Sequence, residues 1–290
     1  MDERAALSLL AERLPTAGDD AAVVGEQVLT TDMLHDRTDF PDGTTRYTAG
    51  WRAVGASLSD VAAMGAAATA AVAVYAAPEF DPEGLEAFVD GASEVCEAVG
   101  GEYVGGDLDD HREFTVATTA LGRTDDPVLR SGASPGEAVC VTGALGLSAV
   151  ALRRFERGEV ERATELFRFQ PRVAAGRALA PHATAMMDSS DGLARSLHQL
   201  AEASDCGAAV ETPLPAHEGV AAVAADEDDR LELTAFFGED FELVCTIPEG
   251  RLADARAACP VALTRVGTTT ESGVTLDGEA MPDRGYTHGE

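Results

Sequence analysis

Apolar and polar positions repeat with two different periods along the first 125 residues of this chain. Trp51, Val54, Leu58 and Val61 recur at helical spacing, which predicts a helix over residues 44–64. A run that is apolar except for Thr69 follows at residues 67–77 and predicts a buried strand. A second helix is predicted to begin near Pro82 and to end at the glycine pair 100–101. Strands are predicted for two segments within 18–34, around a Gly-Glu turn, and for 102–107 and 114–122.

The same alternation of strand and helix returns after a segment rich in Gly, Pro, Ser and Asp at residues 122–137. We therefore predict two domains, residues 1–130 and 131–290. In the second domain a helix is predicted up to about Arg157, and two more helical patterns precede Pro181. Another helix is predicted at 192–204, and strands at 138–143, 183–188, 206–211, 241–247 and 262–268. Both halves thus predict an α/β fold with mixed sheets.

The first fifteen residues predict an amphipathic helix with acidic and basic residues, and they lack the pattern of a signal peptide. Apolar runs are all shorter than the roughly 18–20 residues that a membrane helix needs. These features predict a soluble, cytoplasmic protein that contacts no membrane.

The charge of the chain narrows the possible partners. Asp and Glu number 51 against 21 basic residues, and the formal net charge is −30. This field opposes binding to nucleic acid or to an anionic membrane surface. Because the apolar fraction of 45% favours a folded core over disorder, we interpret the charge as adaptation to high salt, which screens the self-repulsion.

Every basic residue is arginine, and the chain contains no lysine. A Schiff-base lysine and a Walker-type phosphate loop are therefore excluded. Any phosphate chemistry must depend on metal ions, arginine and backbone amides. The five cysteines form no C-x-x-C pair, and we predict buried free thiols rather than disulfides or a zinc site.

Several aspartates stand beside predicted strand ends and are flanked by small or apolar residues. Such positions lie where α/β folds bind ligands, and gathered carboxylates repel one another unless cations lie between them. Mg²⁺ prefers oxygen ligands of this kind. Each aspartate could instead be solvated surface, and Asp191 or Ser190 could simply cap the following helix. The aspartates are Asp19, Asp20, Asp32, Asp60, Asp107, Asp188 and Asp191.

Glycine-rich turns could present backbone amides to a phosphate group. They occur at residues 105–107, 130–136 and 141–146, and glycines also serve close packing. Arg130 is a candidate phosphate partner, and an ordinary salt bridge explains it equally well.

Taken in order, these motifs resemble one known family. They are GDDAA (18–22), TTDM (30–33), SLSDVAAMGA (57–66), GGD (105–107), LRSGASPGE with VTGALG (129–146), DSSDGLA (188–194) and GEDFEL (238–243). The chain is similar to the thiamine-monophosphate kinase family, whose superfamily includes aminoimidazole ribonucleotide synthetase and selenophosphate synthetase. The resemblance implies the two-domain fold of that superfamily, a homodimer formed by the N-terminal domains, and ATP bound near the dimer cleft. It further implies transfer of the ATP γ-phosphoryl group to thiamine monophosphate.

The resemblance also implies roles for individual residues. As Mg²⁺ ligands it implies Asp19, Asp20, Thr30, Thr31, Asp32, Asp60, Asp107, Asp188 and Asp191. As ATP contacts it implies Gly106, Asp107, Arg130 and Ser190. As substrate contacts it implies Asp39, Glu239 and Tyr286. The chain departs from the family at Asp39, where a histidine commonly precedes Phe40; His35 stands four residues earlier. Either Asp39 substitutes for that histidine as a substrate contact, or the contact is lost.

Other functions agree less well with these residues. Selenophosphate synthetase needs a reactive cysteine or selenocysteine and a lysine near the N-terminus, and neither is present before Cys96. Aminoimidazole ribonucleotide synthetase remains an alternative on fold alone. A non-catalytic module that binds nucleotide or thiamine phosphate is the alternative outside enzymes, although all the main acidic motifs are intact.

Overall fold

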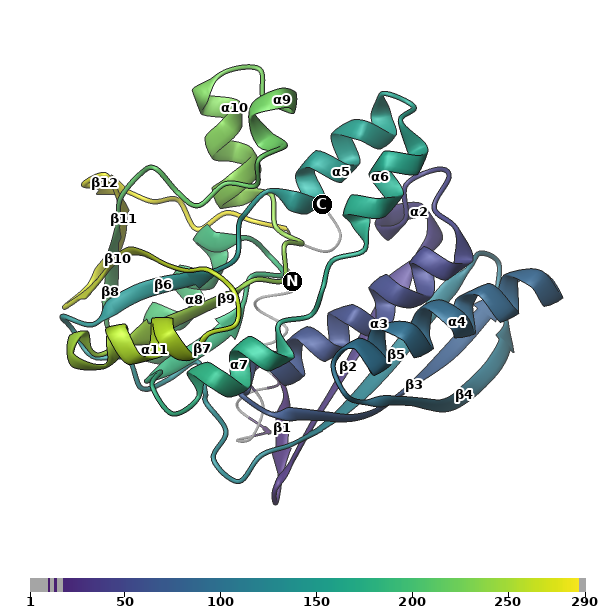
Figure 1. Cartoon of the computed structure of the whole chain (residues 1–290), viewed down its shortest axis with the longest axis horizontal. Coiled ribbons are helices and arrows are strands. Elements are labelled where there is room, and N and C mark those ends of the chain that lie inside the picture. The colour runs from purple at the N-terminus through teal and green to yellow at the C-terminus, as the bar shows by residue number, and fades with distance from the viewer. Residues whose placement is uncertain (1–9, 11–12, 15–17, 287–290) are drawn as a thin grey trace.

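Two mixed β-sheets, one from each half of the chain, form the framework of the computed structural model (Figure 1). The structure describes residues 10, 13–14 and 18–286. Most of the helix predicted for the first fifteen residues lies outside these described residues. All ten predicted strands are present, and the predicted α/β class with mixed sheets is confirmed.

The N-terminal sheet has five strands in the order β1-β2-β5-β3-β4, of which only β3 and β4 are parallel to each other. Helices α3 and α4 cover one of its faces (Figure 1). The opposite face leaves apolar side chains exposed on β2, β3 and β4. The strands are β1 (Ala22–Val24), β2 (Gln27–His35), β3 (Ala67–Ala77), β4 (Glu102–Asp110) and β5 (Thr115–Arg123).

Helix α3 (Arg46–Ala63) carries the predicted apolar stripe, and Val54, Leu58 and Val61 on it are fully buried. It packs closely on α4 (Pro82–Ala98) because glycines lie at their crossing. A Cβ atom on Gly50 would lie 2.2 Å from the Phe88 carbonyl oxygen, and one on Gly91 would lie 2.0 Å from that of Tyr47. This packing fixes the first turns of α3, the helix that carries Asp60 near its other end.

The C-terminal sheet has seven strands in the order β12-β11-β8-β10-β6-β9-β7. The short strands β11 and β12, like the short helix α2 (Asp36–Asp39) in the first half, were not predicted from the sequence. The strands are β6 (Ala138–Thr142), β7 (Ala185–Asp188), β8 (Gly207–Val210), β9 (Leu243–Ile247), β10 (Leu263–Thr270), β11 (Gly273–Leu276) and β12 (Glu279–Ala280). The helices are α5 (Leu147–Glu156), α6 (Val160–Phe167), α7 (Val173–Leu179), α8 (Leu193–Ala203), α9 (Val220–Val223), α10 (Glu227–Leu231) and α11 (Leu252–Ala258), with a π-helical segment at Glu232–Phe236.

One apolar core joins the two halves. Val54 and Leu58 of α3 belong to the same cluster of buried side chains as Cys140 of β6 and Cys245 of β9. Helix α7 lies against α3, and a Cβ on Gly176 would come within 2.0 Å of the Ala62 carbonyl oxygen. The end of α3 is therefore held firmly against the edge of the C-terminal sheet.

All five cysteines have free thiols, and Cys96, Cys140 and Cys245 are buried. Among the described residues, no helix combines the length and the apolar character that crossing a membrane requires.

Candidate active site between the two halves

Three carboxylates from distant parts of the sequence meet where the halves join. Asp20 precedes β1, Asp60 lies near the end of α3, and Asp188 ends β7. Each offers an oxygen atom within 4.8 Å of the other two. The sequence had suggested all three, and the structure brings them together.

The electrostatics of this carboxylate cluster favour a bound cation. Burial and the charges of Asp188, Asp32 and Asp20 raise the pKa of Asp60 well above its usual value. Burial and the charge of Asp20 raise the pKa of Asp188 to about 7. Asp188 Oδ2 is also buried and has no hydrogen-bond partner among the described residues. A hard divalent cation such as Mg²⁺ fits this set of oxygens and would relieve their repulsion.

Arg130 is paired with the cluster rather than placed on the open surface. Its guanidinium donates to both carboxylate oxygens of Asp20, with Nη2–Oδ1 at 2.9 Å and Nε–Oδ2 at 3.2 Å. The Arg130 backbone amide donates to Asp19 Oδ1 at 2.6 Å. Asp19 therefore lies beside the three-carboxylate cluster, where its carboxylate orders the Arg130 backbone.

Hydroxyl groups and further acids extend the cluster into a small cleft. Thr30 Oγ1 donates to Asp60 Oδ2 at 2.5 Å, and Ser190 Oγ donates to Asp188 Oδ1 at 2.9 Å. The cleft has a volume of about 90 Å³. Its lining includes Asp32, Asp60, Ser190, Asp191, Asp39, Glu239 and Tyr286.

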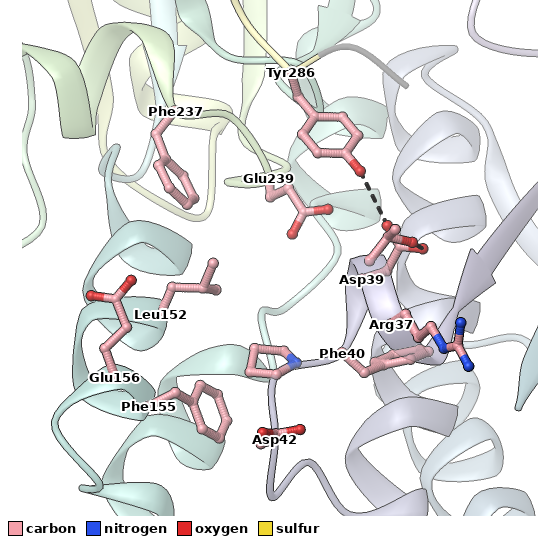
Figure 2. Close-up of a pocket in the computed structure, with 12 residues that line it drawn as sticks. Arg37, Asp39, Phe40, Asp42, Leu152, Phe155, Glu156, Phe237, Glu239 and Tyr286 are labelled. Atoms are coloured by element: carbon pink, nitrogen blue, oxygen red, sulfur yellow. Dashed lines mark hydrogen bonds between the residues drawn. The ribbon is translucent and has the colours of Figure 1, made fainter. Parts of the chain in front are cut away.

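A larger cavity of about 590 Å³ adjoins this cleft, and the two share Asp39, Glu239 and Tyr286 (Figure 2). On one side of it lie Leu152, Phe155 and Glu156 of α5. The segment 37–42 forms the opposite side, and Phe237 lies above α5 in the view. The walls are therefore largely apolar and aromatic, with several carboxylates among them. Such a lining suits a flat organic ring that carries positive charge.

Asp39 and Tyr286 are joined across the cavity. The Tyr286 hydroxyl donates to Asp39 Oδ1 at 3.2 Å (Figure 2). The His35 backbone amide donates to Asp39 Oδ2 at 2.7 Å. Burial and the neighbouring Asp39 and Glu239 charges raise the pKa of Tyr286 to about 12, so the phenol stays protonated near neutral pH. Asp39 thus lies in the site, whereas the His35 ring contacts Thr115 Oγ1 at 3.1 Å.

Three of the residues suggested from the sequence lie away from the cluster. Thr31 is exposed on the opposite face of β2 from Thr30, and its hydroxyl donates to the Thr118 carbonyl. Gly106 and Asp107 lie on the edge strand β4, separated from β2 by β5 and β3. They line a different cavity of about 380 Å³. Gly106 also has a packing role, since a Cβ there would lie 1.7 Å from the Ala73 carbonyl oxygen.

The glycine-rich turn at 141–146 does not present its amides to the cleft. The Gly146 amide donates to Asp240 Oδ2 at 2.6 Å, and the Ser148 amide donates to Asp240 Oδ1 at 3.3 Å. The Ala144 amide donates to Glu242, whose carboxylate also pairs with Arg172 at 2.6 Å. Carboxylates of the chain itself therefore occupy the place suggested for a phosphate group.

Sequence reasoning missed Arg52, which is 2% exposed and pairs with Glu239 at 2.6 Å. An arginine among the small and apolar residues 49–58 of this helix was the available signal. It also missed the aromatic walls of the larger cavity, because Phe155 and Phe237 look like ordinary core residues in the sequence.

Two family models match the chain, one for each half. Residues 18–124 match the AIR synthase related protein N-terminal domain, and residues 134–278 match the AIR synthase related protein C-terminal domain.

Curated relatives and solved structures agree with these matches. A thiamine-monophosphate kinase of Halobacterium salinarum is 63% identical over 99% of this chain and 100% of its own length. One of Methanospirillum hungatei is 38% identical, over 94% of this chain and 93% of its own. A solved structure described as AaThiL complexed with AMPPCP and TMP superposes with a TM-score of 0.90 at 27% identity, covering 99% of this chain and 97% of the other.

Proposed function

Because the chain belongs to the thiamine-monophosphate kinases of the AIR synthase related family, we propose that it transfers the γ-phosphoryl group of ATP to thiamine monophosphate. The products are thiamine diphosphate and ADP. The observation that carries the proposal is the pair of adjoining cavities, one aromatic and acidic, the other lined by the carboxylates around Asp60, with Asp39, Glu239 and Tyr286 common to both. The alternatives, a purine-pathway synthetase or a non-catalytic binding module, are not favoured by these relatives.

The larger cavity matches the organic part of the substrate. Thiamine monophosphate has a cationic thiazolium ring, an aminopyrimidine ring and a phosphate group. Phe40, Phe155 and Phe237 supply apolar walls, and Asp39 and Glu239 supply negative charge. With the rings in this cavity, the phosphate group would extend towards the cleft. The protein's part is then to hold acceptor and donor phosphates in line.

The cleft matches the phosphate chemistry. We propose that Mg²⁺ is held by Asp20, Asp60 and Asp188, with Thr30, Asp32 and Asp191 around them. When bound, the metal supplies neutralisation of the charge on the phosphate groups. Arg130 and Ser190 would contact the nucleotide. An oxygen of the substrate phosphate forms the new bond to the γ-phosphorus, and the bond from that phosphorus to ADP breaks. Because the acceptor is an ionised phosphate, no side chain needs to remove a proton.

We further propose a homodimer formed through the uncovered face of the N-terminal sheet. This face exposes a row of large apolar side chains across three strands, and monomers rarely leave so many together. Asp107 is aligned in register with Val74 of this face, so a second copy docked here would approach the strand that carries Gly106 and Asp107. The exposed residues are Leu29, Met33, Val72, Val74 and Val104.

Light scattering in molar salt tests the dimer, with twice the single-chain mass of 30.0 kDa as the expected result. Introducing a charge with Val74→Glu should give the single-chain mass. A wild-type protein of single-chain mass would contradict the proposal.

Turnover of thiamine monophosphate with Mg²⁺ and ATP in molar salt tests the reaction, with thiamine diphosphate resolved by chromatography. Asp188→Asn should lower kcat by about a hundredfold or more, the scale of losing one charged group that stabilises transferring phosphate. It should also abolish the rise in melting temperature that Mg²⁺ produces in the wild type. Nucleotide binding without thiamine diphosphate formation would exclude the kinase reaction.

A further inference from the structure

Arg52 is a charged side chain that the reaction described above does not use, although it lies at the centre of the junction between the halves. It belongs to α3 and is 2% exposed. Its guanidinium donates to the Phe167 carbonyl at 2.8 Å, to Ser148 Oγ at 3.2 Å and to Glu239 Oε2 at 2.6 Å. It also stacks on the Phe167 ring at 3.7 Å from the ring centroid. Every contact is to the C-terminal half of the chain.

Its carboxylate partner belongs to both cavities of the site. Glu239 lines the aromatic cavity and the carboxylate cleft, and its side chain is 20% exposed. Figure 2 shows the Glu239 carboxylate directed into the space between Tyr286 and Leu152. Among the described residues, Arg52 donates to Oε2 and none donates to Oε1. One oxygen of Glu239 is thus fixed to the protein and the other is presented to the cavity.

The backbone at Glu239 shows that this orientation is imposed by its surroundings. Its φ of 58° is in the left-handed region that non-glycine residues rarely adopt, and Gly238 and Phe241 also have positive φ. The Glu239 amide donates to the Ser190 carbonyl, and its carbonyl accepts from Ser148 Oγ, both at 2.5 Å. Ser148 therefore links the Arg52 guanidinium to the Glu239 backbone. Strained backbone of this kind persists where the surrounding contacts determine it strongly.

We propose that Arg52 is a positioning residue for phosphoryl transfer. It orients the Glu239 carboxylate against the cationic ring of the substrate, and so aligns the acceptor phosphate with the cleft. A buried guanidinium needs a charged partner, and a carboxylate held by a fixed donor on a constrained backbone in a packed site loses little freedom when substrate arrives. This inference rests on the proposed function, because it assumes that a thiazolium-containing phosphate occupies the larger cavity.

The test is steady-state kinetics of Arg52→Lys and Glu239→Gln, singly and together. Lysine keeps the charge but cannot donate to the Phe167 carbonyl, Ser148 and Glu239 from one rigid plane. We expect KM for thiamine monophosphate to rise about tenfold in Arg52→Lys, as for the loss of one charge-assisted hydrogen bond, and kcat to fall with it. KM for ATP should stay within about twofold of the wild type, because the hydrogen bonds of Arg52 go to Phe167, Ser148 and Glu239, and none goes to the three-carboxylate cluster, Arg130 or Ser190.

The double variant distinguishes positioning from a merely structural role. If Arg52 acts through Glu239, adding Arg52→Lys to Glu239→Gln should change KM for thiamine monophosphate by less than about twofold. Independent, multiplying effects would overturn the inference. The inference would also be overturned if Arg52→Lys lowered the melting temperature but left KM for thiamine monophosphate and KM for ATP unchanged. Arg154→Gln is the matched control, because Arg154 is also a buried arginine paired with a carboxylate, Glu159, and lines neither cavity.

Two further measurements keep the result decisive. Ser148→Ala is the substitute variant if Arg52→Lys does not fold. It removes the hydroxyl between Arg52 and the Glu239 backbone and leaves the ion pair in place, so we expect a smaller rise in KM for thiamine monophosphate. If the wild type forms thiamine diphosphate and KM for thiamine monophosphate is unchanged in Arg52→Lys and Ser148→Ala, this inference is overturned and the proposed function is not. Absence of thiamine diphosphate with the wild type would overturn the proposed function together with it.

Discussion

At the scale of single residues, the acidic side chains in and around the site have different roles. Burial and hydrogen-bond partners determine the role of each. Asp188 has a buried oxygen that no described residue hydrogen-bonds, which suits a metal ligand. Asp240 instead receives the amides at the start of α5, and Glu242 pairs with Arg172. In a chain with 51 acidic residues, composition cannot separate these tasks. Burial and hydrogen bonding separate them.

Asp39 gives the first prediction at this scale. Asp39→Ala removes the acceptor of the Tyr286 hydroxyl and one carboxylate of the larger cavity. We expect KM for thiamine monophosphate to rise about tenfold, since the change leaves a polar group unpaired and weakens the attraction for the cationic ring. KM for ATP should not change. Asp36→Ala, on the same short helix but exposed and paired with Arg46, is the control. An unchanged KM for thiamine monophosphate would remove Asp39 from the substrate site.

Asp240 gives a pH dependence. Its burial raises the pKa to about 7 from 3.8, so the folded protein keeps a proton that the unfolded chain releases above about pH 4. This residue's contribution to the free energy of unfolding is therefore fully present below pH 4 and is lost as pH rises to about 7. The slope is at most about 1.4 kcal/mol per pH unit.

Urea unfolding between pH 5 and pH 8 tests this expectation, with saturating Mg²⁺ to hold Asp60 and Asp188 ionised. Asp240→Asn should flatten the pH slope. It should also lower the free energy of unfolding at every pH. The Asn side-chain nitrogen is a donor and must face one of the two backbone amides that donate to Asp240 in the wild type. The slope is therefore the readout, and equal slopes in variant and wild type would contradict the assignment.

At the scale of elements, the C-terminal segment 281–286 is the piece that completes the site, and we name it the C-terminal strap. His198 Nε2 lies 2.9 Å from the Met281 carbonyl oxygen, Arg195 pairs with Asp283 at 3.1 Å, and Arg284 pairs with Glu232 at 2.7 Å. The Tyr286 amide donates to the Asp191 carbonyl at 3.0 Å. The strap therefore sets the position of Tyr286 relative to the loop that carries Asp191.

Gly285 permits this close approach. A Cβ atom there would lie 2.1 Å from the Asp191 carbonyl oxygen and 2.9 Å from Arg195 Cβ. Gly285→Ala should displace the strap, disturb the Tyr286–Asp39 contact and raise KM for thiamine monophosphate by roughly threefold to tenfold, or about 1 kcal/mol. Gly250→Ala is the control, because among the described residues only its own chain neighbours would lie within 4 Å of the added Cβ. Equal kinetics for the two variants would show that the strap does not position Tyr286.

Elements with a strong local period were predictable, and those that depend on a neighbour were not. The stripe on α3 and the alternation along β5 are properties of contiguous sequence. By contrast, β11 forms only because it pairs in parallel with β8, which lies about 65 residues earlier. The period of two along β2 could have placed Thr30 and Thr31 on opposite faces in advance. Asp240 and Glu242 turn inward because α5 and Arg172 receive them, and Glu239 turns to the cavity because Arg52 pairs with it. These partners are distant in the sequence, so no local pattern predicts the orientations.

At the scale of the whole molecule, one core extends across both halves and a net charge of −30 surrounds it. The cluster between the halves adds like charges at the junction. Folding therefore has to overcome repulsion at the surface and at the site together. A cation bound among these carboxylates would relieve only the second of these, whereas dissolved salt acts on the first.

Salt should consequently stabilise the folded chain by screening. The melting temperature should then depend on salt concentration in a way that distinguishes screening from other effects of salt. The Debye length falls from about 10 Å at 0.1 M to about 3 Å at 1 M. We expect the melting temperature in NaCl to rise by at least about 5 °C over this range, steeply at first and then more slowly as the repulsion is screened. Stabilisation by exclusion of salt from the surface would instead continue to rise at higher concentrations.

The pH at which the salt series is measured separates these causes. Near the isoelectric point of about 4.3 the net charge approaches zero, so the self-repulsion that salt screens is largely gone. At pH 7.5 the melting temperature should depend strongly on NaCl, and at pH 4.8 the dependence between 0.1 M and 1 M should shrink to a small fraction. A salt dependence of equal size at both pH values would show that the negative charge is not what couples this protein to salt. Stability in salt would then have to come from surface hydration, which the loss of charge leaves largely in place.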